Sequence, residues 1–469
     1  MATPSRRRRG RPAPRAGRAA APTHARLVAL RVLERVERAG AYADRALRAA
    51  QGRAHLAPAD RALVTELVYG TLRWRGRLDF LLGFALDRDF AKLDPRVLRV
   101  LRLGAYQITR TRVPSASAVD QSVRLVRAVG AERAAGLVNA VLRRLAASWR
   151  DIPLPALEGD PVGHLTHALS LPSWLAERFV GLHGAQEAGA LAAALAEVPP
   201  LVARAHAGRT TRDALLAELR ARYPDAAPGL LAPWAVRLGH GGDPGADPAF
   251  REGRFTLQDE ASQLVVELLD ARPGERVLDV CAAPGTKATA LAERVGDEGR
   301  VLALDRHAGR LGLVGRDARR LGLHGLGVAT ADATAPLDRL APPASFDRVL
   351  VDAPCSGLGS LRRNPDARWR LRPEDPARLA ETQAAILRRA AVALRPGGAL
   401  VYSTCTLLPE ENEAVVEAFL AESPDFRLAT PEEVPACVRP LLSAEAFMRV
   451  LPHRHDADGF FAARLERRA

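Results

Sequence analysis

Two cysteines stand where an α/β protein carries out its chemistry. Cys405 lies in STCT, directly after the apolar run GGALVYS, and Cys355 lies in DAPCSG, directly after FDRVLVD. Both runs predict buried strands, and ligands of open α/β sheets bind beyond the carboxyl ends of such strands. A thiolate is a good nucleophile, and a nearby helix N-terminus lowers the pKa of a thiol. The pattern predicts two reactive thiols in one crevice.

The other two cysteines are expected to pack rather than react. Cys281 lies inside a tight turn, and Cys437 has no motif around it. Four scattered cysteines without a CxxC pair indicate neither a disulfide framework nor a metal site, and they are typical of the reducing cytoplasm. No apolar run approaches the length of a membrane span. We therefore expect a cytoplasmic protein that needs neither metal nor membrane.

A strand-to-helix turn with the sequence VLDVCAAPGTKATALAERV begins the same region. Small residues and a Pro-Gly pair let a backbone approach a ligand closely, and a helix N-terminus favours negative charge. The G-x-G-x-x-G pattern is missing, which disfavours a dinucleotide-dependent oxidoreductase. Lys287 lies in this turn although the chain otherwise uses arginine, with Lys92 as its one other lysine. Because the pKa of lysine shifts readily on burial, Lys287 is expected to have a chemical role.

Acidic residues close the next predicted strands. Asp305 ends the second strand, about where such folds place an acid on ribose hydroxyls. Asp332 and Asp352 close the third and fourth. An arginine-rich loop, LRRNPDARWRLRP, surrounds Trp369. Arginines hold phosphates and an aromatic ring stacks on an unpaired base, so this loop favours a nucleic-acid substrate over a merely solvated surface.

The elements that position these residues predict a multidomain chain. Residues 1–21 contain seven arginines and no acid, half of the formal charge of +14, and are expected to be a disordered tail that suits phosphate backbones. Residues 22–150 show helical periodicity throughout, and residues 151–253 predict a helical and small α+β subdomain. From 254 to 469 strands and helices alternate, which predicts a mainly parallel, Rossmann-like sheet covered on both faces. The last segment, FMRVLPHRHDADGFFAARLER, predicts two added antiparallel strands.

These motifs together resemble the RsmB (Sun/Fmu) family of RNA cytosine-C5 methyltransferases. The resemblance rests on VLDVCAAPGTK, DAPCSGLGSLRRNPD, LVYSTCTLLPEENE, QDEASQLV and the closing DGFF. The helical segment, with LVYGTLRWRGRLD and GLVNAVLRRL, resembles the NusB-like RNA-binding domain of that family. Two departures stand out. Thr286 replaces the second glycine of the usual CAAPGGK, and PPLVARAH replaces PPLTLRVN, which puts RNA contacts of that strand in question.

The resemblance implies a mechanism and a set of site residues. Cys405 would add to C6 of a cytosine, Cys355 would assist release, and Asp352 and Lys287 would hold the base. S-adenosylmethionine would be the cofactor, and the resemblance implies these binding residues: Cys281, Ala282, Ala283, Pro284, Gly285, Thr286, Lys287, Asp305, Asp332 and Asp352. The implied substrate is 16S ribosomal RNA with a single-stranded or flipped-out cytosine, and we expect a monomer.

Two alternatives stay open from the sequence. A methyltransferase with the same chemistry that acts on transfer RNA or another ribosomal site is one alternative, against which the NusB-like domain argues. A non-catalytic RNA-binding or assembly protein is the other alternative, against which the intact Cys405, Cys355, Asp352 and Lys287 argue.

Overall fold

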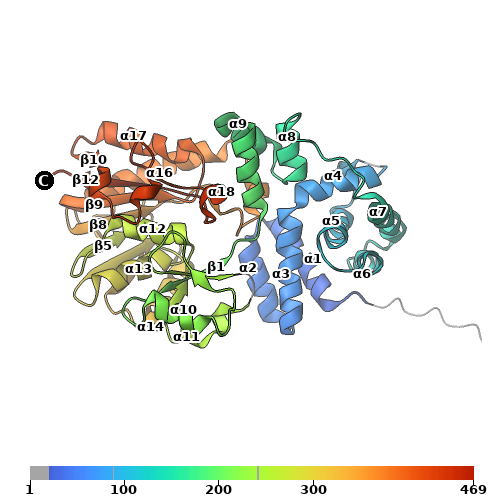
Figure 1. The fold of residues 1–469 in the computed structure, drawn as a ribbon, viewed down its shortest axis with the longest axis horizontal. Helices are drawn as coiled ribbons and strands as arrows, with labels where there is room; N and C mark the ends of the chain where they lie inside the picture. The colour runs from blue at the N-terminus through green and yellow to red at the C-terminus, as the bar shows by residue number, and fades with distance from the viewer. Residues whose placement is uncertain (1–20, 88, 240–241) are drawn as a thin grey trace, which may run out of the picture. The chain divides into compact units, whose positions relative to one another are not determined.

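The structure is a computed structural model that describes residues 21–87, 89–239 and 242–469 (Figure 1). The chain divides into two compact units, Met1–Pro153 and Leu154–Ala469. The predicted basic tail lies, apart from residue 21, outside the described residues, so its disorder and its role stay predictions. No helix within the described ranges is both long and apolar enough to cross a membrane.

The first unit consists of helices wherever it is described, as its periodicity predicts. Val28, Val32 and Val36 of the first helix recur at helical spacing and are all buried in one core. Two short 3-10 turns, η1 and η2, lie between the helices. The bounds are α1 His24–Ala39, α2 Ala43–Arg53, α3 Pro58–Arg73, α4 Arg75–Ala85, η1 Phe90–Lys92, α5 Pro95–Arg110, α6 Ser115–Ala128, η2 Glu132–Ala134 and α7 Ala135–Ser148.

The second unit begins with helices and a small antiparallel sheet in the order β2-β3-β1-β4. Its helix α9 is interrupted at Gly184, whose φ of 75° lies in the left-handed region. The bounds are α8 Pro161–Gly163, η3 His164–Ala168, α9 Ser173–Ala196, β1 Leu201–Ala205, α10 Arg212–Leu219, β2 Ala227–Pro228, β3 Ala235–Gly239, η4 Pro244–Ala246, α11 Pro248–Arg251 and β4 Phe255–Leu257. The predicted α+β subdomain is confirmed. Because β4 pairs with β1, the small sheet continues past the boundary that we propose after residue 253.

A large sheet of eight strands forms the rest of the second unit. Strands β9, β8, β5, β6 and β7 are parallel neighbours, as predicted, and β12 lies antiparallel between β9 and β10, with β11 paired to β12. The strands are β5 Arg276–Asp279, β6 Arg300–Asp305, β7 Leu326–Thr330, β8 Phe346–Asp352, β9 Leu394–Thr404, β10 Phe426–Leu428, β11 Met448–Val450 and β12 Phe460–Arg467.

Helices cover this sheet and short helical turns connect its edge. The longer helices are α12 Glu260–Leu269, α13 Thr286–Val295, α14 Ala308–Leu321, α16 Asp375–Val392 and α17 Glu413–Glu422. The short ones are η5 Leu358–Ser360, α15 Ala367–Arg370, η6 Pro409–Glu411, η7 Pro431–Glu433, η8 Arg439–Leu441 and α18 Pro452–His455. Two cores, one on each face, hold the sheet between the helix layers. The carboxyl ends of β5, β6, β8 and β9 therefore share one edge.

The arginine-rich loop buries two of its five arginines, so the prediction that its arginines hold phosphate is wrong for these two. Arg362 and Arg368 are 2% and 0% exposed. Arg368 donates hydrogen bonds to the backbone carbonyls of Ser170 and Leu195, at 3.2 and 3.0 Å. Arg368 thus fixes the loop to the segment that carries α9, whereas Arg362 pairs with Asp456 at 2.8 Å.

Arg363 of the same loop joins three parts of the second unit. Its guanidinium lies 2.7 Å from the Asp259 carboxylate, just before α12, and 2.8 Å from Asp458, just before β12. A third bond reaches the Pro200 carbonyl before β1 at 3.3 Å. A half-buried arginine paired with two carboxylates is held in one place, so the loop, the small sheet and the C-terminal strands are mutually positioned.

The Glu260 carboxylate supports a loop of the small subdomain from the start of α12. Glu260 is 2% exposed and accepts the backbone N–H groups of Leu230, Leu231 and Ala232, at 3.2, 2.7 and 3.0 Å. Glu260→Ala would leave three donors without their acceptor, and we expect it to lower the free energy of unfolding by about 1–3 kcal/mol. Denaturant unfolding followed by circular dichroism measures this. The exposed Glu298→Ala serves as the control, and equal midpoints for both variants would refute the support that we assign to Glu260.

Candidate active site

The two predicted thiols lie in contact at the edge of the large sheet. Cys405 follows β9 directly, and Cys355 lies three residues beyond β8. Since β8 and β9 are parallel neighbours, their carboxyl ends bring both loops together. The Sγ atoms are 3.4 Å apart, within hydrogen-bond range for sulfur. The geometry allows one thiol to exchange a proton with the other.

A buried glutamate ties the two cysteine loops to each other. The Glu411 carboxylate, 0% exposed, accepts bonds from the Ser356 N–H at 2.8 Å, the Ser356 hydroxyl at 2.5 Å and the Thr406 hydroxyl at 3.0 Å. Gln383 on α16 donates a further bond at 3.0 Å. Ser356 follows one cysteine and Thr406 follows the other. Glu411 was not among the residues predicted from the sequence.

The pKa of Cys355 moves opposite to the prediction. The pattern predicted that a helix N-terminus lowers it, but the hydrogen bond with Cys405, together with burial, raises the pKa of Cys355 well above its usual value. Cys355 therefore keeps its proton at neutral pH.

Lys287 and Asp352 form an ion pair beside the thiols. The Lys287 Nζ lies 2.7 Å from one Asp352 oxygen, and the Ser403 hydroxyl donates to the other oxygen at 2.9 Å. The Lys287 side chain is 9% exposed, and its Nζ lies 4.9 Å from the centre of the Phe460 ring. A cation over an aromatic face is stabilised there. The arrangement places a positive and a negative group next to each other in the crevice.

The turn between β5 and α13 has the close packing that a ligand cradle requires. Gly285 has a φ of 113°, and a Cβ at this position would come within 3.0–3.1 Å of Val314. Thr286, by contrast, is the first residue of the right-handed helix α13, so its place does not demand a glycine. Ala282 and Ala283 are buried, Pro284 is exposed, and burial raises the pKa of Cys281 well above its usual value.

A buried arginine of the small sheet supports the same turn. Arg204 on β1 donates to the Thr286 carbonyl at 2.9 Å and pairs with Glu293 on α13 at 2.6 Å. A third bond reaches the Gln258 side chain at 2.9 Å. The altered strand PLVARAH thus contributes to the catalytic domain through Arg204, a contact that its sequence did not indicate.

The predicted acids differ in how they are held. Asp305 is 6% exposed and accepts the N–H groups of Ala283 and His307, at 3.3 and 2.8 Å. Arg310, which sequence reasoning missed, lies 3.9 Å from Asp305 and donates to the Ala283 carbonyl at 2.5 Å. Asp332 lies two residues beyond β7 and is exposed, and hydrogen bonds from Thr334 lower its pKa.

Asp279 is a further acid that sequence reasoning did not single out. It ends β5, is 1% exposed, and neither carboxylate oxygen has a hydrogen-bond partner of ordinary geometry in the described part of the chain. Burial, together with the charge of Asp352, raises its pKa to about 8. A buried carboxyl without a partner is costly unless a ligand supplies one. Its place at the end of β5 was the only sequence signal.

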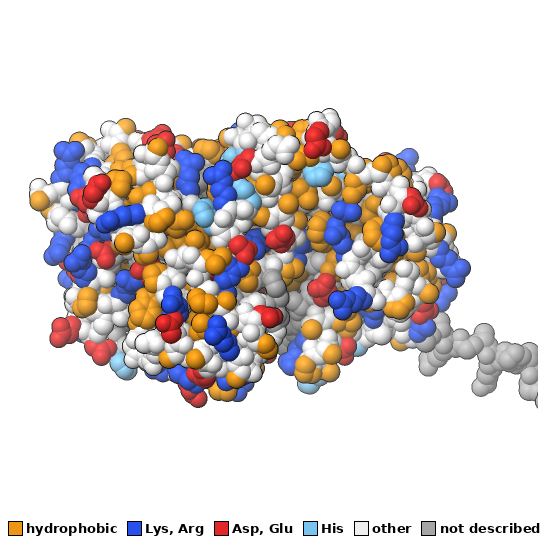
Figure 2. Space-filling model, viewed as in Figure 1, with side chains coloured by type: hydrophobic (Ala, Val, Ile, Leu, Met, Phe, Trp, Pro, Cys, Tyr) orange, Lys and Arg blue, Asp and Glu red, His pale blue; other side chains and the backbone are white. Residues whose placement is uncertain are grey.

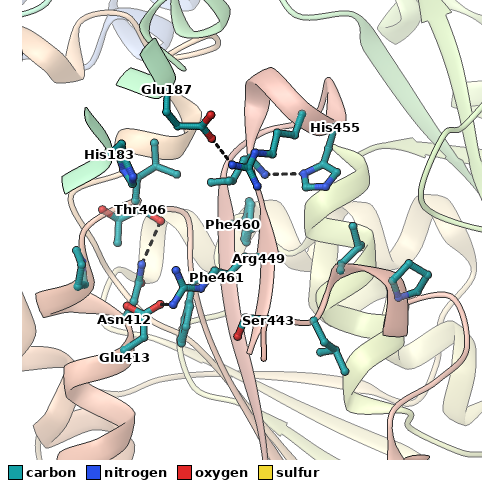
Figure 3. A pocket seen from close by; sticks show the side chains of 17 residues that line it. His183, Glu187, Thr406, Asn412, Glu413, Ser443, Arg449, His455, Phe460 and Phe461 are labelled. Atoms are coloured by element: carbon teal, nitrogen blue, oxygen red, sulfur yellow. Dashed lines mark hydrogen bonds and ion pairs between the residues drawn. The ribbon is translucent and has the colours of Figure 1, made fainter. Parts of the chain in front are cut away.

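A pocket of about 500 Å³ adjoins the Cys405 loop (Figure 3). Thr406 and Leu407 contribute to its wall, as does Phe460. Arg449 pairs with Glu413 at 2.9 Å, and Arg454 pairs with Glu187 at 2.5 Å. In each pair the charge of the arginine is balanced by that of the glutamate. The pocket provides room beside the Cys405 loop without excess charge from its arginines.

Three family models match this chain in succession. The NusB family matches residues 23–147, and the ferredoxin-like domain of RsmF/B-like methyltransferases matches residues 171–243. The model described as 16S rRNA methyltransferase RsmB/F matches residues 266–466, which span the turn, both cysteines and the C-terminal strands.

Whole-length relatives agree with these models. The probable ribosomal RNA small subunit methyltransferase B of Synechocystis sp. is 38% identical over 451 residues, 94% of this chain and 99% of that protein. The probable ribosomal RNA small subunit methyltransferase B of Bacillus subtilis is 36% identical over 450 residues, 95% and 99% of the two chains. The crystal structure of PH0851 matches with a TM-score of 0.78 at 25% identity, covering 96% of this chain and 100% of that one. The chain belongs to the 16S rRNA methyltransferase RsmB/F family.

Proposed function

We propose that this protein methylates C5 of a cytosine in 16S ribosomal RNA through a covalent bond between Cys405 and C6 of that base. The observation that carries the proposal is the contact of the two thiols, 3.4 Å apart, beyond the ends of β8 and β9. The names of the relatives, small subunit methyltransferase B, support the 16S substrate.

The chemistry explains why a thiol is needed. Cytosine C5 is a poor nucleophile, and a thiolate that adds to C6 turns the ring into an enamine with electron density at C5. S-adenosylmethionine, when bound, supplies the methyl group in an electrophilic form. Afterwards a base takes the C5 proton, and the Cys405 sulfur leaves C6. The target base has to be unpaired or flipped out of its helix for this sulfur to reach it.

The two cysteines would have different roles, one in attack and the other in release. Cys405 would attack, since it lies at the end of β9 with its loop fixed by Glu411 through Thr406. Cys355 keeps its proton, because its hydrogen bond to Cys405 and its burial raise its pKa. A protonated thiol 3.4 Å from the attacking sulfur would stabilise the departing thiolate by a hydrogen bond and so assist release.

Asp352 and Lys287 would orient the base beside the thiols. A carboxylate accepts hydrogen bonds from the exocyclic amino group of cytosine, and Asp352 is the acid at the end of β8. Lys287 is 2.7 Å from that carboxylate and would balance its charge or exchange a proton with groups on the base. Ser403 fixes the second oxygen of Asp352, which limits the rotation of the carboxylate.

The residues of the turn fit S-adenosylmethionine. That cofactor carries positive charge on its amino group and its sulfur, and the buried Asp279 has no hydrogen-bond partner of ordinary geometry among the described residues. Gly285 lets the backbone turn closely, and Asp305 follows β6, where an acid suits ribose hydroxyls. The remaining proposed contacts are the predicted ones: Cys281, Ala282, Ala283, Pro284, Thr286, Lys287, Asp332 and Asp352.

The two alternatives have less support. The names of the relatives, small subunit methyltransferase B, favour 16S ribosomal RNA over transfer RNA or another ribosomal site. A protein that only binds RNA would not need the contact between the two thiols or the ion pair of Lys287 and Asp352. Bisulfite sequencing of ribosomal RNA from a strain without the gene tests the substrate. One cytosine in 16S RNA should lose its methyl group, and an unchanged 16S pattern would overturn the proposal.

The cysteine variants separate attack from release. Cys405→Ala should abolish methyl transfer and leave cofactor binding intact. Cys355→Ala should still attack and then stall, because the departing sulfur lacks its donor, so protein linked to RNA should accumulate. A denaturing gel after incubation with 16S RNA and S-adenosylmethionine shows this as a slow, nuclease-sensitive band. The double variant is the control without a band, and a band in Cys405→Ala alone would reverse the two roles.

Asp305→Ala tests the cofactor site. Loss of a hydrogen bond to a charged group should weaken S-adenosylmethionine binding by about 1.5–3 kcal/mol. Calorimetry without RNA measures the affinity, with the exposed Asp338→Ala as a matched control at a nearby loop. If both variants bind as tightly as the wild type, Asp305 does not contact the cofactor.

The raised pKa of Asp279 predicts a pH-dependent affinity. At pH 6–7 its carboxyl, with a pKa of about 8, is largely protonated in the free protein. A cationic ligand favours the ionised form, so binding should release a proton, and affinity should rise toward tenfold per pH unit between pH 6 and 7.5. Calorimetry in buffers of different ionisation enthalpy counts the proton. Asp279→Asn should bind weakly without this slope, and a flat wild-type profile would exclude Asp279 as the partner of the cation.

A further inference from the structure

Two glycines form a close contact between the backbones of two loops beside Cys405. Gly359 lies in η5, in the loop that follows Cys355, and Gly459 lies in the closing DGFF motif, directly before β12. A Cβ atom on Gly359 would lie 2.1 Å from the Gly459 carbonyl oxygen, and a Cβ atom on Gly459 would lie 2.8 Å from the Gly359 Cα. Neither glycine has a φ in the left-handed region, so the close approach of the two backbones is what requires glycine at both positions.

The same two glycines are joined to the Cys405 backbone by hydrogen bonds. The Gly359 N–H donates to the Cys405 carbonyl at 2.9 Å, and the Gly459 N–H donates to the Gly359 carbonyl at 2.9 Å. Gly359 is therefore bonded on one side to the proposed nucleophile and on the other side to the DGFF motif. A change in the distance between the two glycines would act on the bond that holds the Cys405 carbonyl.

Both loops are anchored next to this contact, so they do not separate easily. On the side of η5, Leu358 is 0% exposed and belongs to the core that contains residues of α9. On the side of the DGFF motif, Asp458 is buried and pairs with Arg363 at 2.8 Å. Because the packing of Leu358 and the ion pair of Asp458 oppose a movement of either loop as a whole, a methyl group added between the glycines would distort the backbone at the contact itself, which includes the bond to Cys405.

The charges on the surface do not by themselves place a base against the Cys405 sulfur. On the face drawn in Figure 2, basic side chains are interspersed with acidic ones over the second unit rather than gathered in one stripe. Attack requires the sulfur to approach C6 of the base to within about 3–3.5 Å and in a suitable direction. Interspersed charges do not supply such precision, so contacts within the chain have to fix the sulfur.

We propose that Gly359 and Gly459 are positioning residues for the reaction, which set the place of the Cys405 backbone and thereby the reach of its sulfur toward the base. The inference rests on the proposed function, in which Cys405 attacks. Neither glycine has a side chain, so both act through Cys405 and not through a contact of their own with RNA or cofactor. The glycine of the DGFF motif is thus needed where two backbones meet without a Cβ atom between them.

Gly459→Ala tests the inference in the full-length protein. A misplacement of about 1 Å can slow a reaction about 100-fold, so kcat for methyl transfer to deproteinised 16S RNA should fall about 10- to 100-fold. The KM values for RNA and for S-adenosylmethionine should stay close to those of the wild type, because no contact to either is removed. Gly312→Ala on α14 is the matched control, since a Cβ there meets nothing within 4 Å, and it should keep the wild-type kcat. A Gly459→Ala variant with the wild-type kcat, or with a loss confined to KM, overturns the inference.

Hydrogen exchange of the wild-type protein keeps the inference testable if Gly459→Ala does not fold. The bonded N–H groups of Gly359 and Gly459 should exchange about as slowly as those of β9, as measured by mass spectrometry of the peptides that contain them. Rapid exchange at both glycines would show that the contact does not hold and would overturn the inference. A wild type that transfers no methyl group to the RNA contradicts the proposed function, and the inference falls with it. An active wild type with an equally active Gly459→Ala overturns the inference alone.

Discussion

The relative position of the two thiols depends on the hydrogen bonds that the buried Glu411 carboxylate accepts. An acid removed from water is unfavourable unless donors surround it, and burial accordingly raises the pKa of Glu411. Its donors come from the loop after β8, through Ser356, and from the loop after β9, through Thr406. Satisfying this one acid therefore brings both loops into a fixed relation. The 3.4 Å contact of Cys355 with Cys405 follows from that relation.

Arginines that are buried or half-buried connect the other parts of the second unit in the same way. Arg204 joins the small sheet to α13 and to the first carbonyl of that helix. Arg363 joins the loop after β8 to the residues before α12 and before β12. Each side chain can meet several acceptors at once because its guanidinium is planar and carries five donors. The small subdomain and the turn between β5 and α13 thus support each other.

The order of the elements could be predicted well from the sequence, because apolar residues with a period of two or 3.6 indicate strands or helices whatever surrounds them. The sequence also located Cys355, Cys405 and Asp352 at strand ends, where parallel topology alone brings residues together, and Lys287 in the segment that leads from β5 into α13. It did not predict Glu411 or Asp279, since the burial of a polar group depends on contacts between residues distant in the chain. The prediction that the arginines of the loop hold phosphate was partly wrong for the same reason, because composition gives the number of guanidinium groups but not which of them are buried.

The identity of the attacking sulfur is the central claim, and a fluorinated base tests it most directly. A cytosine that carries fluorine at C5 has no C5 proton to lose after methylation, so the adduct with the attacking cysteine persists. RNA with this base would be incubated with the wild-type protein and S-adenosylmethionine, digested, and analysed by mass spectrometry. The account predicts the nucleotide on the peptide that contains Cys405. A nucleotide on the peptide that contains Cys355 would contradict it.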